Sequence, residues 1–347
     1  MNILFYLVHD YSIPIFRPLV SFLITEKKEY DFRFFLSEKI AKSVPEEWAE
    51  EKVLRSFPEA RKFNPDFVLC AENYLDYRLP GLKVQLFHGV GVEKKAHYAI
   101  RHFFDLYLTS GPLVTERFKE MAKHYNYFDV VETGWPKFDH ILNFTLPQND
   151  FLNKNRGGKE VILYAPTFSR RMQSAEVLAK AIPQLIRKDE IWLVKFHELM
   201  SPKLKRLYES IEGENLKIVR ESDITPYLHL ADLMISDTSS VVYEFLCLEK
   251  PVITFRTIGN PEKGLDIREP EELRPVLDLL KENPDFKKSE RLKMLNRVNP
   301  NLDGKISNRV FDVLLNIHTH GLSSKRTKPA NLFRKAKIWF SYYWSFS

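Results

Sequence analysis

The stretch "ADLMISDTSSVVYEFLCLEKPVITF", residues 231–255, contains the pattern that decides the fold. Its apolar start predicts a buried strand, a helical pattern then runs to Leu248, and "KPVITF" predicts a second strand. Two strands joined by a helix predict a right-handed crossover and a parallel sheet. An acid and two small hydroxyl residues, Asp237, Ser239 and Ser240, interrupt the pattern between the first strand and the helix.

The same alternation runs through the chain in two series. The first contains "NILFYLV", "YDFRFFLS", "PDFVLCA", "LKVQLFHG", "DLYLTS" and "YFDVVETG", and the second begins with "VILYAPTF", "IWLVKFH" and "LKIVRES". A polar stretch, residues 146–159, separates them and predicts a short hinge. The fold is therefore expected to be α/β, with two Rossmann-like domains that face a central cleft. Residues 1–148 form the first domain, 149–320 the second, and 321–347 a tail.

Composition narrows the class of protein. The chain has 347 residues, of which 44% are hydrophobic, so both domains can have a core. Cys70 and Cys247 lie in apolar runs, which favours buried, reduced thiols and a cytoplasmic location. The N-terminal sequence lacks a basic region and has His9 and Asp10 too early for a signal peptide, so it is interpreted as a strand and a loop.

Basic residues gather after Asp312, beyond which no acidic residue occurs. Six of them, which equal the whole formal excess of +6, are Lys325, Arg326, Lys328, Arg334, Lys335 and Lys337. The rest of the chain is balanced, which argues against nucleic-acid binding. Residues 331–347 predict an amphipathic helix with aromatic residues on one side, typical of a helix that lies in an anionic membrane surface. The membrane residues expected are Arg334, Lys335, Lys337, Trp339, Phe340 and Trp344; packing against the first domain is the alternative.

Polar residues follow five of the predicted strands. They are His88-Gly89, Thr133-Gly134, Pro166-Thr167, His197 and residues 237–240. In a doubly wound fold these positions face one crevice, which predicts a binding site there. Each alone is explained equally well by ordinary turn chemistry.

The residue types indicate what such a site could bind. Ser239 and Ser240 begin the helix, so their hydroxyls and backbone N–H groups could hold a phosphate; the alternative is that Asp237 or Thr238 caps the helix. His88 could accept a proton from a hydroxyl, and His197 could donate to a phosphate oxygen. Lys195 shares a strand face with His197. Five further histidines lack such a placement and are interpreted as structural or surface residues: His9, His97, His102, His124 and His229.

The sequence lacks the motifs that identify several classes of enzyme. It has no metal-ligand spacing, no paired cysteines, no glycine-rich nucleotide loop and no Gly-x-Ser-x-Gly turn. No metal and no cofactor are therefore expected.

Five stretches together resemble the CDP-glycerol glycerophosphotransferases, the teichoic-acid primases and polymerases. The stretch quoted first is similar to their second-domain signature, and "LFHGVGVEKK", "TGWPKFD", "LYAPTFSRR" and "VKFHE" are similar to four other family motifs in the same order. The resemblance covers residues 86–255 and implies a GT-B fold.

The resemblance also implies roles for individual residues. His88 corresponds to the base that deprotonates the acceptor hydroxyl, and His197 to a histidine near the pyrophosphate. Thr167, Arg170, Ser239 and Ser240 match positions in the donor phosphate site, to which we add Lys195. Supporting positions are Gly89, Asp237, Gly134, Lys137 and Glu244. The chain departs from the family at residues 90–92 and at Lys137, Ser169 and Glu198, which leaves the donor and the acceptor open.

The function expected is transfer of glycerol phosphate, or a similar alditol phosphate, from a CDP-linked donor to a lipid-linked glycan or polymer, with release of CMP. The expected location is the inner face of the cell membrane. A GT-B glycosyltransferase or a UDP-sugar 2-epimerase-like enzyme shares the architecture and is one alternative. A non-catalytic peripheral membrane protein is another.

Overall fold

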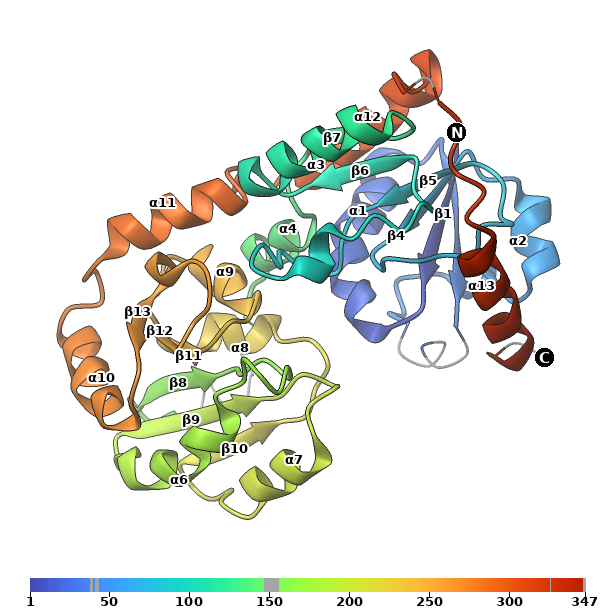
Figure 1. Cartoon of the computed structure of the whole chain (residues 1–347). Helices are drawn as coiled ribbons and strands as arrows, with labels where there is room; N and C mark the ends of the chain where they lie inside the picture. The colour runs from blue at the N-terminus through green and yellow to red at the C-terminus, as the bar shows by residue number, and fades with distance from the viewer. Residues whose placement is uncertain (38–39, 41–43, 147–155, 325, 346–347) are drawn as a thin grey trace. The chain divides into compact units, whose positions relative to one another are not determined.

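The computed structural model describes all residues except 38–39, 41–43, 147–155, 325 and 346–347, and describes no side chains beyond residue 340. The chain forms two compact units (Figure 1). The first unit consists of Met1–Val90, Lys95–His140 and Asn299–Ser347, and the second of Gly91–Lys94 and Ile141–Val298.

The first unit is built on a seven-stranded parallel sheet with the strand order β3-β2-β1-β4-β5-β6-β7. Its strands are β1 (Asn2–Leu7), β2 (Asp31–Leu36), β3 (Val53–Leu54), β4 (Phe67–Cys70), β5 (Leu82–Gln85), β6 (Leu106–Thr109) and β7 (Asp129–Glu132). Its helices are α1 (Ile13–Glu26), α2 (Phe57–Phe63), α3 (Pro112–Tyr125), α4 (Lys137–Leu142), which continues into the second unit, α12 (Ile306–His320) and α13 (Leu332–Ser345). Three 3₁₀ turns complete it: η1 (Asp10–Ser12), η2 (Glu50–Lys52) and η3 (Lys95–Tyr98).

The second unit contains a six-stranded parallel sheet with the order β10-β9-β8-β11-β12-β13. Its strands are β8 (Glu160–Tyr164), β9 (Glu190–Lys195), β10 (Leu216–Val219), β11 (Leu233–Ser236), β12 (Val252–Phe255) and β13 (Leu265–Ile267). Its helices are α6 (Ala175–Leu185), α7 (Pro202–Glu209), α8 (Thr225–Leu230), α9 (Val241–Leu246), α10 (Leu273–Glu282) and α11 (Lys288–Val298), with the 3₁₀ turns η4 (Pro261–Lys263) and η5 (Pro270–Glu272).

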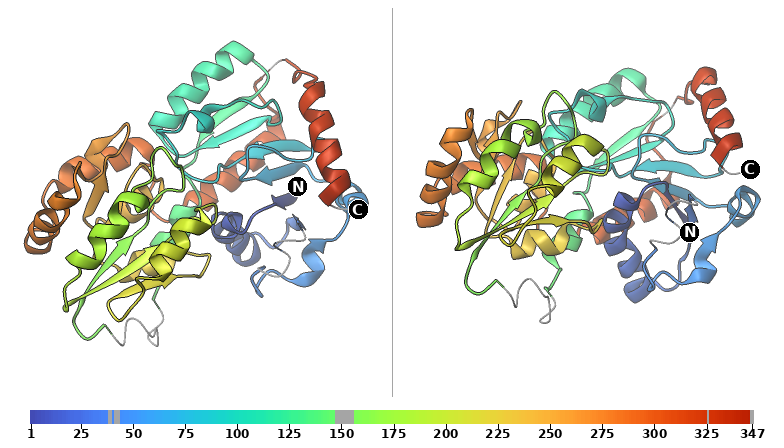
Figure 2. Two further views of the ribbon diagram at one scale, coloured as in Figure 1. Left: turned by 60° about the horizontal axis from the view of Figure 1, so that its bottom comes forward. Right: turned by 90° about the horizontal axis from the view of Figure 1, so that it is seen from below.

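Both sheets confirm the predicted α/β class and the parallel pairing. Every strand predicted from the sequence is present, and β11 pairs in parallel with both β8 and β12. Each residue of β11 is buried, since helices lie against both faces of this sheet (Figure 2). The sequence prediction missed β3 and β13, which have only 2 and 3 residues and therefore show little pattern.

The C-terminal part of the chain returns to the first unit. Residues 299–320 were predicted in the second domain, but the structure places them in the first unit. The ring of Phe311 on α12 packs edge-on against Phe22, with 5.7 Å between ring centroids. Asp139 accepts hydrogen bonds from the backbone N–H groups of Ile306 (3.0 Å) and Ser307 (2.7 Å), so it holds the start of α12.

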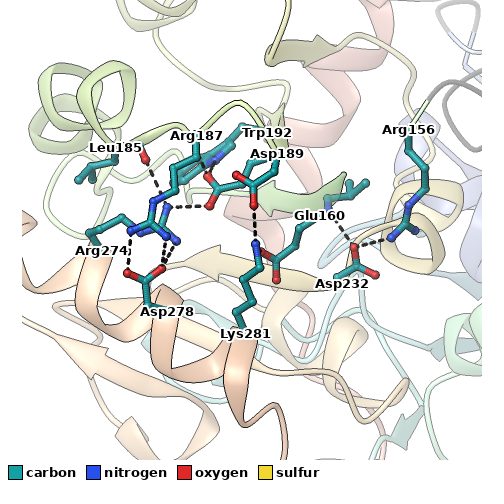
Figure 3. Close-up of polar contacts among 12 residues, drawn as sticks. Arg156, Glu160, Leu185, Arg187, Asp189, Trp192, Asp232, Arg274, Asp278 and Lys281 are labelled. Carbon is teal, nitrogen blue, oxygen red and sulfur yellow. Dashed lines mark hydrogen bonds and ion pairs between the residues drawn. The ribbon is translucent and has the colours of Figure 1, made fainter. Parts of the chain in front are cut away.

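Charged residues at the amino ends of the second sheet form a network that holds α10 (Figure 3). Glu190, the first residue of β9, has a fully buried side chain and accepts from Arg274 at 2.7 Å and from the Trp192 indole at 2.9 Å. Lys281 pairs with Asp189 at 2.9 Å. These charges lie at the edge of the sheet opposite to the predicted site residues, so we interpret them as structural.

The tail residues are tied to the first unit at the start of α13. The Lys328 ammonium pairs with Asp105 at 2.8 Å, and the Asn331 side chain donates to the Arg101 carbonyl at 2.7 Å. Beyond these contacts, large apolar side chains of α13 are exposed: Leu332, Phe333, Trp339 and Phe340. The side chain of Trp344 lies outside the described residues. Of the helices described, none combines the length and the apolar character that crossing a bilayer requires.

Candidate functional site

Asp237 organises the turn that follows β11. Its fully buried carboxylate accepts from the Thr167 N–H (2.9 Å) and from both the N–H and the hydroxyl of Ser174 (2.9 Å each). Burial raises the pKa of Asp237, and these hydrogen bonds oppose that rise. Asp237 therefore fixes the ends of the loop of residues 167–174 and does not cap α9.

Thr238 bonds to the segment after β12 and not to α9, since its hydroxyl accepts a hydrogen bond from the Ile258 N–H at 2.9 Å. Neither Asp237 nor Thr238 therefore caps α9, and the capping alternative given for them is wrong. Helix α9 begins at Val241 and has only 6 residues, fewer than the pattern to Leu248 predicted. Its dipole is correspondingly small, so an anion here would depend mainly on side-chain donors.

Ser239 and Ser240 lie between these two anchored residues and α9. Both are partly exposed, and Ser240, the residue before the helix, makes no side-chain capping bond. Within the described part of the chain, neither hydroxyl has a hydrogen-bond partner. Two partly exposed hydroxyls at the carboxyl end of a parallel strand can donate to a phosphate.

The loop after β8 brings a second group of predicted residues to the same edge. Thr167 is buried and bonded to Asp237, whereas Arg170 is exposed. Phe168, between them, lies against the ring of His197, with 4.4 Å between centroids. The guanidinium of Arg170 is thus accessible to a ligand.

His197 follows β9, and its Nδ1 accepts the backbone N–H of Leu199 at 3.1 Å. A neutral imidazole that accepts at Nδ1 carries its proton on Nε2, which makes Nε2 a donor. The side chain is exposed, so this donor can reach a phosphate oxygen. Phe168 and the Leu199 N–H together restrict the ring orientation.

Lys195 and Glu244 are held within the second unit, Lys195 by a hydrogen bond to the backbone and Glu244 by burial. The Lys195 ammonium donates to the Glu221 carbonyl at 2.6 Å, which links the ends of β9 and β10. Glu244 lies on α9 and is buried. Neither observation places them against the serines.

His88 in the first unit follows a strained residue. Phe87 has φ of 61°, in the left-handed region that bulky residues rarely occupy. The indole N–H of Trp135 donates to the Phe87 carbonyl at 3.0 Å, and the Phe87 ring stacks on His97 at 4.7 Å. The left-handed residue after β5 is thus Phe87, and Gly89 is not among the glycines with positive φ. His88 follows Phe87 directly, and its side chain is exposed.

Gly134 and Lys137 lie in the motif that supports this turn. Gly134 has φ of 92°, and an added Cβ would stand 2.8 Å from Ile306, so both conformation and space require glycine. The Lys137 ammonium lies 5.7 Å from the Trp135 ring. Both residues therefore support Trp135, which in turn positions Phe87.

The structure places Tyr11 beside His88, and beside Tyr11 it places His9, which was interpreted as a structural or surface residue. The ring of Tyr11 lies between His9 and His88, with centroid distances of 5.1 and 5.8 Å. Close to β1, the buried carboxyl of Glu72 accepts from the Ser12 hydroxyl at 2.7 Å, and burial raises its pKa. His9 follows β1 as His88 follows β5, so the strand-end rule would have selected it.

A cavity of about 750 Å³ in the first unit contains none of these residues. It is lined by residues of β2, β3 and the segments beside them, including Phe35, Trp48 and Leu54. In the second unit, by contrast, the loop of residues 167–174, His197 and the serines all follow strands at the carboxyl edge of the sheet. The predicted residues thus form two groups, one in each unit.

Part of the chain matches a known protein family. Residues 87–257 match the family CDP-glycerol:poly(glycerophosphate) glycerophosphotransferase. A teichoic acid glycerol-phosphate primase from Bacillus subtilis (strain 168) is 32% identical over 218 residues, which are 54% of this chain and 55% of the primase. The chain spans about half the length of the curated relatives it matches.

Solved structures share the fold over most of the chain. The wall teichoic acid polymerase TagF aligns with a TM-score of 0.66 at 18% identity, over 93% of this chain and 90% of that one. A UDP-GlcNAc 2-epimerase from Neisseria meningitidis aligns with a TM-score of 0.64 at 14% identity, over 91% of this chain and all of the epimerase. These likenesses establish the GT-B type of fold. By its family match, the segment of residues 87–257, which holds His88, Thr167, His197 and both serines, belongs to the CDP-glycerol:poly(glycerophosphate) glycerophosphotransferases.

Proposed function

We propose that this protein transfers glycerol phosphate, or a similar alditol phosphate, from a CDP-linked donor to a hydroxyl of a lipid-linked acceptor. The observation that carries the proposal is the group of donors in the second unit: the two serine hydroxyls without partners in the described ranges, the exposed Arg170 and the oriented His197. They lie in the segment that matches the glycerophosphotransferase family.

The proposed chemistry requires one base and several phosphate ligands. His88 accepts the proton of the acceptor hydroxyl, whose oxygen forms a bond to the β-phosphorus of the donor. The bond from that phosphorus to the bridging oxygen breaks, and CMP leaves with that oxygen. The Nε2–H of His197 and the hydroxyls of Ser239 and Ser240 offset the charge that develops on the phosphate oxygens. No step needs a metal or a cofactor.

A screen of nucleotide donors tests the proposal. CDP-glycerol and CDP-ribitol are expected to raise the melting temperature of the protein, because a ligand that binds only the folded state stabilises it by mass action. The same donors with a lipid-linked acceptor are expected to release CMP. Stabilisation by UDP-GlcNAc alone, with formation of its epimer or release of UDP, would replace this function by the alternative that the shared epimerase fold supports.

We also propose that α13 holds the protein on the anionic inner face of the cell membrane, where a lipid-linked acceptor resides. Its exposed residues include Leu332, Phe333, Trp339 and Phe340, with Arg334 and Lys337 beside them. Aromatic and basic side chains on one short helix suit the interface of an anionic bilayer. The ion pair of Lys328 with Asp105 would keep this helix attached to the first unit.

Replacing Phe333, Trp339 and Phe340 together with serine is expected to abolish sedimentation with phosphatidylglycerol vesicles and to leave CMP release from a water-soluble acceptor unchanged. Leu199→Ser is the matched control, since Leu199 is a large apolar residue of the second unit with 66% exposure. Sedimentation that the triple variant retains would show that α13 is not the anchor. Deletion of the chain after Lys328 should have the same effect as the triple substitution.

A further inference from the structure

Residues Gly91–Lys94 belong to the second unit by their contacts, although the chain on both sides belongs to the first. The side chain of Glu93 attaches them. Its carboxylate oxygen Oε1 accepts from the Tyr243 hydroxyl at 2.6 Å, from the Lys263 ammonium at 3.0 Å and from the Asn260 amide at 3.4 Å. Only 3% of the Glu93 side chain and none of the Lys263 side chain are exposed.

Gly259 makes room for this attachment. It has φ of 96°, and an added Cβ would stand 2.7 Å from the Cγ of Glu93. A buried ion pair that is also bonded by a hydroxyl and an amide has a fixed geometry, since each partner restricts the others. The four residues Glu93, Tyr243, Asn260 and Lys263, here called the Glu93 clasp, therefore determine where the next residue lies.

That next residue is Lys94, whose backbone N–H closes a tight turn onto the Gly91 carbonyl at 2.9 Å. Its side chain is half-buried, and the charges that act on it are those of Asp237, Glu93 and Lys263. Burial lowers the pKa of the Lys94 ammonium, and Asp237 opposes that change. Tyr243, which bonds to Glu93, lies on α9 three residues after Ser240, so Lys94 follows a residue anchored directly beside the turn after β11.

The Lys94 ammonium has no hydrogen-bond acceptor among the residues that the structure describes. The nearby carboxylates already accept hydrogen bonds from other groups. Asp237 accepts from Thr167 and Ser174, and Glu93 accepts from the other residues of its clasp. An ammonium has three N–H donors, and withdrawing it from water without acceptors is unfavourable. A ligand rich in acceptor oxygens would therefore offer partners to all three donors.

Phosphate supplies such oxygens, and the serine hydroxyls that follow Asp237 also have no hydrogen-bond partner among the described residues. A buried carboxylate at this turn would repel a phosphate, and the charge of Lys94 offsets that repulsion. We propose that Lys94 binds the phosphates of the donor directly and that the Glu93 clasp positions it. The identity of the donor rests on the function proposed above, whereas the affinity for a diphosphate does not.

The test measures the binding of inorganic pyrophosphate, CDP and CDP-glycerol by calorimetry. Lys94→Met is expected to weaken all three by about 10–100-fold, the usual contribution of a charge-assisted hydrogen bond. Lys94→Arg should restore part of the affinity. Lys95→Met is the matched control, because Lys95 is the exposed neighbour, and it should bind pyrophosphate like the unmodified protein.

A second measurement uses the unmodified protein and therefore does not depend on the folding of a variant. Acylation with acetic anhydride, followed by mass spectrometry, reports the accessibility of each amine. Pyrophosphate is expected to protect Lys94 and to leave Lys95 equally reactive. A lysine that only balances the charge of Asp237 would not gain this protection.

Unchanged pyrophosphate affinity in Lys94→Met would overturn the inference, and so would equal acylation of Lys94 with and without pyrophosphate. Absence of binding of any diphosphate by the unmodified protein would also overturn it. The unmodified protein could bind pyrophosphate but neither bind CDP-glycerol nor release CMP. If Lys94→Met then loses pyrophosphate binding, the role of Lys94 is supported and the proposed function is rejected. The two proposals can therefore fail separately.

Discussion

His88→Ala is expected to lower the rate of CMP release by about 10²–10⁴-fold, the usual contribution of a general base. The affinity for the CDP-linked donor is expected to stay unchanged, because the proposed donor ligands lie in the second unit and His88 in the first. The geometry supports a dedicated role, since Phe87 adopts a strained φ of 61° directly before His88 and Trp135 holds its carbonyl. Strain of this kind persists only where the surrounding structure fixes it.

The measurement is CMP release with saturating acceptor, together with the dissociation constant of CDP-glycerol by calorimetry. His124→Ala is a matched control, because His124 is an exposed histidine of the first unit outside the site. Near-normal CMP release by His88→Ala would reject His88 as the base. A loss of donor affinity as large as the loss of rate would instead assign His88 to donor binding.

Arg274→Met is expected to destabilise the second unit by about 3–5 kcal/mol, because it removes one partner of a buried ion pair. The Glu190 side chain is fully buried, and Arg274 donates to it at 2.7 Å, to Asp278 at 2.7 Å and to the Leu185 carbonyl at 3.2 Å (Figure 3). Without Arg274, the Oε1 atom of Glu190 loses its charged partner. The free energy of desolvating that carboxylate is then no longer offset.

Urea unfolding of the full chain, followed by tryptophan fluorescence, gives the stability, since Trp192 bonds to Glu190 and reports on the second unit. Arg187→Met is the control. Arg187 pairs with Asp278 in the same network, but its side chain is 47% exposed, so the loss of stability should be much smaller than for Arg274→Met. Equal effects of the two substitutions would show that burial does not determine the strength of these pairs.

Glu190→Gln, introduced together with Arg274→Met, should restore part of the stability. The neutral amide removes the unpaired charge and keeps a hydrogen-bonding group beside the Trp192 indole. Failure of this second substitution to improve the stability would assign the loss to packing and not to charge.

The sequence by itself determined all strands except β3 and β13, their parallel pairing and the residues that follow them. Runs such as Ile3–Leu7 and Leu233–Ile235 are continuously apolar because both faces of each sheet are covered, and this local pattern suffices to identify them. The family motifs likewise lie in consecutive residues, so His88, His197 and the serines could be selected without a structure.

Only the tertiary structure decided what these residues touch. Asp237 holds Thr167, 70 positions earlier, and Glu93 reaches Lys263, 170 positions later. Helix α12 returns to the first unit because Asp139 and the ring of Phe22 offer partners that the sequence around α12 does not reveal. Such contacts depend on how far-separated segments pack, whereas a sequence pattern reports only on neighbours along the chain. The sequence therefore selects the two serines that we propose to bind phosphate, and the fold adds Lys94 to that proposal.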